Sequence, residues 1–278
     1  MQPPGGSVFP AARSAVYSLQ SPRRPRLTPR PLGSNPKATD TMICALCLSD
    51  KPLANSHVIP ETVYRPTYDA KHRAEEMSTK SRRFIQKGYR EKLLCLECEG
   101  RLSKYEKYFA DTWFGKNGLP EYVQGEGVVL KALDYRPFKL FHLSILWRGS
   151  VSRLRQFADV SLGKHEEIIR TAIINDDPGP ELRYPFFAAV LVEEPSGKVR
   201  DELIVSPIAK RLRAHRVYFF TFAGCCWFYV VSGHPIEPHL RPFILRSSGQ
   251  LRLRRWHWLD HKPYVQVVQA YFNSAGAR

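Results

Sequence analysis

Two short stretches with the same cysteine spacing, Cys44-Ala45-Leu46-Cys47 and Cys95-Leu96-Glu97-Cys98, decide the fold of the N-terminal part of this chain. Two residues between a pair of thiolates allow both sulfurs to reach one tetrahedral ion at about 2.3 Å. Two such pairs in one small region favour a closed site of four thiolates around a structural zinc ion. The alternatives are unrelated cysteine pairs or redox dithiols, although one redox site does not need two pairs. A zinc ion with four protein ligands would stabilise its module without performing chemistry.

The segment between the two pairs carries Asn55-Ser56-His57-Val58-Ile59-Pro60, followed by a polar stretch rich in lysine and arginine over residues 66–92. We expect a knuckle and a short hairpin over residues 43–64, and a partly helical polar stretch. After the second pair, apolar residues recur at helical spacing up to about Phe114 and predict a helix: Leu102, Tyr105, Phe109 and Trp113. The sequence therefore predicts a zinc module over residues 42–118.

The order of these motifs resembles the four-cysteine branch of the HNH endonucleases, over residues 43–114. It is also similar to an uncharacterised bacterial family in which a longer C-terminal domain follows such a module. The resemblance implies a ββα-metal fold with His57 as the general base, a role that suits a group with an unperturbed pKa near 6.5. It also implies one catalytic magnesium or manganese ion, with Ser56 and Glu99 at the positions of the family's metal ligands. The family's middle asparagine has no counterpart in residues 87–94, where Arg90 and Glu91 stand.

A second carboxylate accompanies Glu99 on the predicted helix. Glu106 follows it by seven residues, which is two helical turns, so both side chains lie on nearly the same face. Glu99 and Glu106 are therefore candidate ligands of the catalytic cation, because magnesium prefers oxygen ligands. The alternatives are that Glu99 only favours the helix N-terminus, that Glu106 pairs with a local base, and that His57 is a structural histidine.

The charge of the chain points to a polyanionic partner. Forty-two Lys and Arg against twenty-six Asp and Glu give a net charge of +16 at pH 7. Nucleic acid, and DNA in preference to RNA, is the expected partner, since neutralised phosphates release counterions. Membrane-surface binding and a generally basic surface without a partner are the alternatives. The candidate nucleic-acid contacts are Arg82, Arg83, Arg90, Arg252 and Arg254, with a second basic cluster at Lys210, Arg211, Arg213 and Arg216.

The alternation of Leu251-Arg252-Leu253-Arg254 places both arginines on one face of a predicted strand. The alternative to nucleic-acid contact is that this face is only exposed to solvent. No run of 18 apolar residues is present, and we expect no membrane span. The N-terminus lacks the apolar stretch of a secretory signal, and paired C-x-x-C spacing suits a reducing compartment. We therefore expect a cytoplasmic protein.

Outside the zinc module, residues 1–41 are predicted to be a disordered, basic tail rich in proline and arginine. Residues 128–278 are predicted to form an α+β domain whose sequence does not reveal its role. In a nuclease, we expect this domain to recognise the target or a protein partner. Its helices are expected over residues 138–147 and 164–174. Three hairpins should follow, with strands at 186–194 and 199–205, at 217–222 and 226–231, and at 243–246 and 251–258. The fold class is therefore α+β, with the helical segment packed on an antiparallel sheet.

Two functions agree with these features. The first is a metal-dependent HNH-type endonuclease that hydrolyses phosphodiester bonds of DNA. The second is a zinc module with a degenerate catalytic centre, which binds nucleic acid or protein without cleavage. Ser56 and the missing asparagine favour the second, whereas His57 and the carboxylate pair favour the first.

Overall fold

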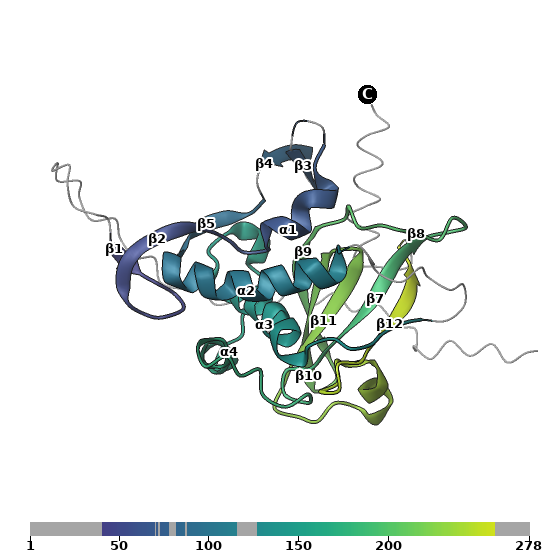
Figure 1. Ribbon diagram of the computed structural model, residues 1–278. Coiled ribbons are helices and arrows are strands. Elements are labelled where there is room, and N and C mark those ends of the chain that lie inside the picture. The colour runs from purple at the N-terminus through teal and green to yellow at the C-terminus, as the bar shows by residue number, and fades with distance from the viewer. Residues whose placement is uncertain are drawn as a thin grey trace, which may run out of the picture. The chain divides into compact units, whose positions relative to one another are not determined.

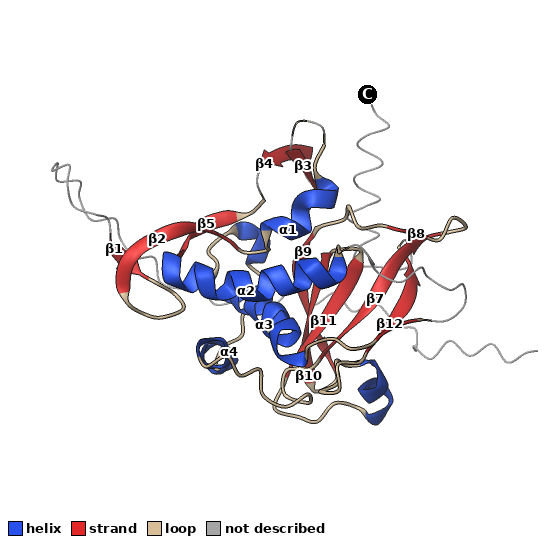
Figure 2. Ribbon diagram, viewed as in Figure 1, coloured by secondary structure: helices blue, strands red, loops and turns tan. Residues whose placement is uncertain are grey.

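The computed structural model describes residues 41–69, 71, 73–77, 82–86, 88–115 and 127–258. The predicted tail thus lies outside the described residues, apart from Thr41. Residues Thr39–Arg278 cluster as one compact unit. The chain is a mixed α+β protein with antiparallel sheets and a cluster of four cysteines, in agreement with the predicted fold class (Figures 1 and 2).

The N-terminal part is a three-stranded antiparallel sheet followed directly by a long helix (Figure 1). The sheet has the order β1-β2-β5, and helix α2 begins at the residue after β5. The bounds are β1 Thr41–Ile43, β2 Asp50–His57, β5 Arg90–Cys95 and α2 Leu96–Trp113. Between β2 and β5 lie α1 Glu61–Tyr64, the 3-10 helix η1 Arg65–Thr67, and the paired strands β3 Arg73–Met77 and β4 Arg82–Gln86. The polar stretch expected to be partly helical is therefore mainly a hairpin.

Helix α2 confirms the helical spacing seen in the sequence. Its buried residues are Cys98, Leu102, Tyr105, Phe109 and Trp113, which repeat every three or four positions and form one apolar stripe. The helix stops at Trp113, two residues before Gly115. A Cβ atom on Gly115 would lie 2.1 Å from the carbonyl oxygen of Asp111, so the chain can leave the helix along this path only with glycine.

The C-terminal part combines two helices with a seven-stranded sheet. The helical bounds are α3 Tyr135–Val151, η2 Arg155–Phe157, α4 His165–Ile174 and η3 Pro238–Phe243. The strands are β6 Val128–Leu130, β7 Phe186–Glu193, β8 Lys198–Val199, β9 Val205–Leu212, β10 His215–Phe222, β11 Cys225–Val231 and β12 Leu251–His257. Their order is β6-β12-β7-β11-β10-β9, with β8 beside β7; all pairs are antiparallel except β12 with β7.

Both expected helices and the β10–β11 hairpin are confirmed. The hairpin expected to join residues 243–246 with β12 is wrong, because 243–246 lie at and beyond the end of η3 and β12 pairs with β6 and β7. Pro238 and Pro242 lack the backbone N–H that strand pairing requires. The β9–β10 hairpin was missed, because its turn uses Arg213 at φ 53°, without the glycine or asparagine typical of such turns.

Helices α2 and α3 pack against one face of the large sheet, as Figure 2 shows. The ring of Phe109 on α2 stacks on Phe141 of α3 with centroids 3.9 Å apart. The indole N–H of Trp113 donates to the carbonyl of Ala223 in the β10–β11 turn, at 2.9 Å. Helix α3 is buried along nearly its whole length, yet no helix in the described ranges combines the length and hydropathy that a membrane crossing needs. One aromatic core thus ties the cysteine-bearing helix to the sheet.

Replacing Phe109 by alanine should therefore destabilise the whole compact unit. Phe109 is fully buried and stacks on Phe141. We expect the free energy of unfolding to fall by about 3–5 kcal/mol, as for other buried phenylalanines. Urea unfolding followed by circular dichroism measures this loss. The matched control is Phe114→Ala, because Phe114 is 37% exposed; an equal loss for both variants would contradict the placement of Phe109 in a shared core.

Candidate functional site

Four cysteine side chains converge where the N-terminal sheet meets α2. Cys44 and Cys47 lie in the turn after β1, Cys95 ends β5, and Cys98 lies in the first turn of α2. Their sulfur atoms all lie within 4.8 Å of one another, and none forms a disulfide. The Cys47 and Cys95 sulfurs are 3.8 Å apart, which matches the edge of about 3.8 Å of a tetrahedron with bonds of about 2.3 Å. This cluster can hold a metal ion.

The backbone around the cluster prepares the sulfurs for that role. The N–H of Cys95 donates to the Cys44 sulfur at 3.3 Å. Burial acts to raise the pKa of Cys47, but hydrogen bonds from the backbone and hydroxyl of Ser49 and from neighbouring thiols outweigh it and lower that pKa to about 6. Burial raises the pKa of Cys98. A metal ion that binds here would have to displace protons from thiols such as Cys98, whose pKa is raised.

His57 closes strand β2, at the other end of the β2–β5 pair from Cys95, and takes part in a second group of side chains. It pairs in register with Arg90 of β5. Its Nε2 lies 2.5 Å from Glu61 Oε2 and 2.7 Å from the Nε of Arg90. Arg90 also donates to Glu61 Oε2 at 3.0 Å. Together with Tyr68, whose hydroxyl donates to Glu61 Oε1 at 2.6 Å, these residues form what we call the His57 cluster.

The two contacts of the His57 Nε2 atom belong to different protonation states. A neutral nitrogen without a proton accepts from the Arg90 guanidinium, whereas an Nε2–H group donates to the Glu61 carboxylate. When Glu61 is an anion, it favours the state in which His57 carries a proton on Nε2. Burial acts to raise the pKa of Glu61, but the hydrogen bonds from Tyr68 and Arg90 and the charge of His57 outweigh it and lower that pKa. The cluster thus places one ring nitrogen between a guanidinium and a carboxylate, and this nitrogen can accept a proton only in the first of the two states.

A buried arginine from α3 connects His57 with Glu106. Arg148 is 1% exposed, and its Nη1 donates both to the carbonyl oxygen of His57 at 2.9 Å and to Glu106 Oε1 at 2.8 Å. Glu106 therefore shares a guanidinium with the backbone carbonyl of His57, and that guanidinium neutralises its charge. Ser56, at the position of a family metal ligand, is buried, and its hydroxyl accepts the N–H of Leu94 at 3.0 Å.

Glu99 differs from Glu106 in having no such partner. Its Oε1 atom is buried without a hydrogen bond. Among the described residues, the four cysteines are nevertheless the only group of three or more His, Cys, Asp or Glu side chains close enough to hold a metal ion. The geometry therefore gives no support to a cation held jointly by Glu99 and Glu106.

The predicted nucleic-acid contacts are scattered over three places. Arg90 belongs to the His57 cluster. Arg252 and Arg254 are exposed on the same face of β12, where Arg254 lies 4.6 Å from the ring centroid of Phe243. Arg82 and Arg83 lie on β4, and their side chains are outside the described part. Among the arginines whose side chains are described, Arg90 and the β12 pair belong to different sheets.

Sequence reasoning missed two residues of the site. Glu61 stands four positions after His57, and that spacing could have revealed it. Arg148 lies 91 residues from His57, and no local pattern could have linked them. Comparisons of this chain with protein-family models, with curated proteins and with solved structures found no match.

The lowered pKa of Glu61 predicts how stability depends on pH. A carboxyl group with a lowered pKa contributes stability above its ordinary pKa of 4.5, and this contribution is lost as the pH falls through the lowered value. Glu61→Gln should therefore cost about 1 kcal/mol at pH 6, a small value because the pair is partly screened by solvent. The difference from the wild type should shrink as the pH falls below 4.5.

Urea unfolding of both proteins over a range of pH measures this difference. Glu97→Gln is the control, because Glu97 is mostly exposed and pairs with Lys51 on the surface; it should unfold with the wild type. A constant difference between Glu61→Gln and the wild type over the acid range would contradict the role given to this carboxylate.

Proposed function

We propose that residues 41–115 form a zinc-stabilised ββα module of the HNH type, which hydrolyses phosphodiester bonds with His57 as the general base. The observation that carries the proposal is the position of His57. It ends the first of two antiparallel strands, α2 follows the second, and a four-cysteine cluster lies where the strand and helix join. Its Nε2 atom has both a carboxylate and a guanidinium within hydrogen-bonding distance.

Zinc is the metal that best fits the cysteine cluster. Four sulfur ligands from two C-x-x-C turns are typical of structural zinc, and the sulfur spacing agrees with tetrahedral coordination. With all four positions filled by protein, this ion holds the loop, strand and helix together without contacting a substrate. The thiolates would require a reducing compartment, and we place the protein in the cytoplasm.

The His57 cluster suggests a sequence of proton movements. A substrate phosphate attracts the Arg90 guanidinium, which leaves the His57 Nε2 lone pair available to a water molecule. Nε2 takes a proton from that water as its oxygen forms the bond to phosphorus and the bond to the leaving oxygen breaks. The new Nε2–H then donates to Glu61, whose negative charge stabilises the imidazolium. The leaving oxygen takes up a proton from solvent.

Glu99 is the one residue that we propose as a protein ligand of a catalytic magnesium or manganese ion. Its buried, unpartnered Oε1 is a suitable oxygen ligand, and magnesium is commonly bound through one or two carboxylates together with substrate phosphates. When bound, such an ion would stabilise negative charge on the leaving oxygen. Glu106 is not proposed as a ligand of this ion, because its carboxylate accepts a hydrogen bond from Arg148.

The substrate that best fits the composition is nucleic acid, and we propose DNA. The net charge of +16 attracts a polyanion over the whole surface. The domain formed by residues 128–258 would add recognition of the target or of a protein partner.

A second candidate function is nucleic-acid or protein binding without cleavage. It is favoured by the ion pair between Glu106 and Arg148, which removes a carboxylate expected to bind the cation. The two candidates differ in one measurable property, which is cleavage that depends on His57.

The metal proposal predicts about one zinc ion per chain in protein purified without chelators. Cys95→Ser should lose that zinc and unfold the N-terminal module, since its short strands bury little surface on their own. Cys226→Ala is the control, because Cys226 is buried in the large sheet away from the cluster. Elemental analysis measures the zinc content per chain. A zinc-free wild-type protein, or a Cys95→Ser protein with full zinc content, would contradict the proposal.

The nuclease proposal predicts cleavage of plasmid or single-stranded DNA in the presence of magnesium or manganese. His57→Ala should slow cleavage by about 100- to 10,000-fold, the usual contribution of a general base, with unchanged zinc content and DNA affinity. His239→Ala, at an exposed histidine of η3, is the control. If the wild type binds DNA but does not cleave it, or if His57→Ala cleaves normally, the binding function replaces the enzymatic one.

A further inference from the structure

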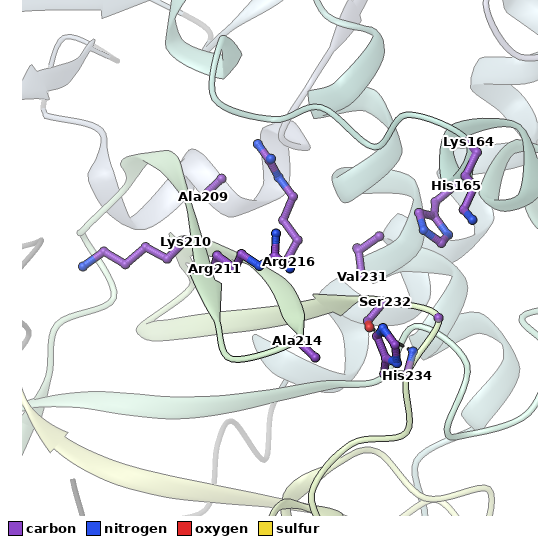
Figure 3. A pocket seen from close by; sticks show the side chains of 11 residues that line it. Lys164, His165, Ala209, Lys210, Arg211, Ala214, Arg216, Val231, Ser232 and His234 are labelled. Carbon is purple, nitrogen blue, oxygen red and sulfur yellow. Dashed lines mark hydrogen bonds between the residues drawn. The ribbon is translucent and has the colours of Figure 1, made fainter. Parts of the chain in front are cut away.

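A basic cavity lies on the large sheet, away from the His57 cluster. It has a volume of about 410 Å³ and is bounded by the start of α4, the β9–β10 hairpin and the end of β11 (Figure 3). Six of its lining side chains are basic or imidazole groups, and the rest are neutral. These six are Lys164, His165, Lys210, Arg211, Arg216 and His234. The cavity is in the size range of small-ligand sites.

In the part of the chain that the structure describes, no ion pair balances these charges. Among the described residues, none of the four cations Lys164, Lys210, Arg211 and Arg216 forms an ion pair with an Asp or Glu. The nearby Arg213, in the same hairpin but outside the cavity lining, does pair with Glu237 at 3.5 Å. The cavity therefore gathers positive charge that no ion pair with a described residue compensates.

The strand register makes this arrangement unfavourable without a ligand. Arg211 and Arg216 are directly opposite each other in the β9–β10 pair, whereas Lys210, paired with Val217, projects from the other face of the two strands. Like charges directly opposite across two strands destabilise a sheet. An anion in the cavity would convert this repulsion into attraction, since guanidinium groups bind phosphate through paired hydrogen bonds.

Some of the lining groups are held in place by the fold. The Arg216 guanidinium lies 5.5 Å from the centroid of the Tyr218 ring. The Nδ1 atom of His165 lies 3.0 Å from the Tyr184 hydroxyl, which fixes the imidazole at the start of α4. The Ser232 hydroxyl accepts the N–H of His234 at 3.0 Å and shapes the loop after β11. These contacts reduce the conformational entropy lost when a ligand binds.

We propose that this cavity binds nucleotide phosphate groups, with nucleic acid as their source. The choice of nucleic acid rests on the proposed function, whereas the binding of phosphate rests on the cavity alone. The cavity would hold the substrate at a second point, separate from the residues that act on the phosphodiester. A free mononucleotide offers the same chemistry, and competition separates the two sources.

The test measures binding of a fluorescent single-stranded oligonucleotide by anisotropy, with full-length His57→Ala protein and without added magnesium or manganese. No cleavage is expected under these conditions. The binding result therefore stays interpretable even if the protein turns out not to be a nuclease. The double variant Arg211→Gln/Arg216→Gln should bind at least tenfold more weakly. For this variant, the slope of log affinity against log salt concentration should be less steep by about 1–2, because two phosphate contacts to a single strand are lost.

The matched control is Lys131→Gln/Lys198→Gln, which removes the same net charge from exposed positions outside the cavity lining. It should bind within about twofold of the parent. The melting temperature of the Arg211→Gln/Arg216→Gln protein should be equal or higher, because a repulsive pair has been removed. A loss of binding together with a retained fold thus isolates the cavity.

Competitors identify the source of the phosphate. Displacement by unlabelled oligonucleotide and not by AMP or pyrophosphate supports a nucleic-acid backbone, and displacement by all three supports a mononucleotide phosphate site. Displacement by polyglutamate as effective as that by oligonucleotide would overturn the proposal in favour of an acidic protein partner. Equal affinity of the two double variants would overturn it as well.

Discussion

The contact among four cysteine sulfurs is the constraint from which the N-terminal part of the molecule is built. It joins the turn after β1, the end of β5 and the first turn of α2, and the outermost cysteines, Cys44 and Cys98, are 54 residues apart in the sequence. The strands β1, β2 and β5 are short, and they bury little apolar surface of their own, whereas α2 is packed on α3 and the large sheet. A metal ion held by the sulfurs would supply the missing free energy. The position of His57 at the end of β2 follows from the same constraint, since β2 is held between β1 and β5.

Charged side chains buried at the junction of α2 and α3 impose a second constraint. Arg148 is almost fully buried and satisfies both Glu106 and the carbonyl of His57. Removing one member of such a buried pair leaves an uncompensated charge, so the arrangement is specific even where its net stabilisation is small. The same guanidinium that keeps His57 in place withdraws Glu106 from metal binding. The free carboxylate oxygen of Glu99 and the anionic Glu61 are what remain for chemistry.

Local patterns in the sequence predicted the elements whose causes are local. The cysteine spacing, the apolar stripe from Leu102 to Trp113 and the alternation in β12 each depend on neighbouring residues and are confirmed. The parallel pairing of β12 with β7 was not predictable, because it joins strands some 65 residues apart whose own sequences do not encode the partner. Arg148 shows the same limit for the site. The basic cavity escaped prediction because its residues come from three separate segments, although the cluster from Lys210 to Arg216 was visible.

Hydrogen exchange in the presence and absence of metal tests the central claim, that the cysteine cluster holds the strands that present His57. Mass spectrometry of the zinc-loaded protein should find slow exchange in β2, β5 and the first turns of α2. After chelation, protection in these segments should be lost, while β7, β10 and β11 remain protected by their own aromatic core. Unchanged protection of β2 and β5 in the metal-free protein would contradict the account, because the strands would then hold His57 in place without the cysteines.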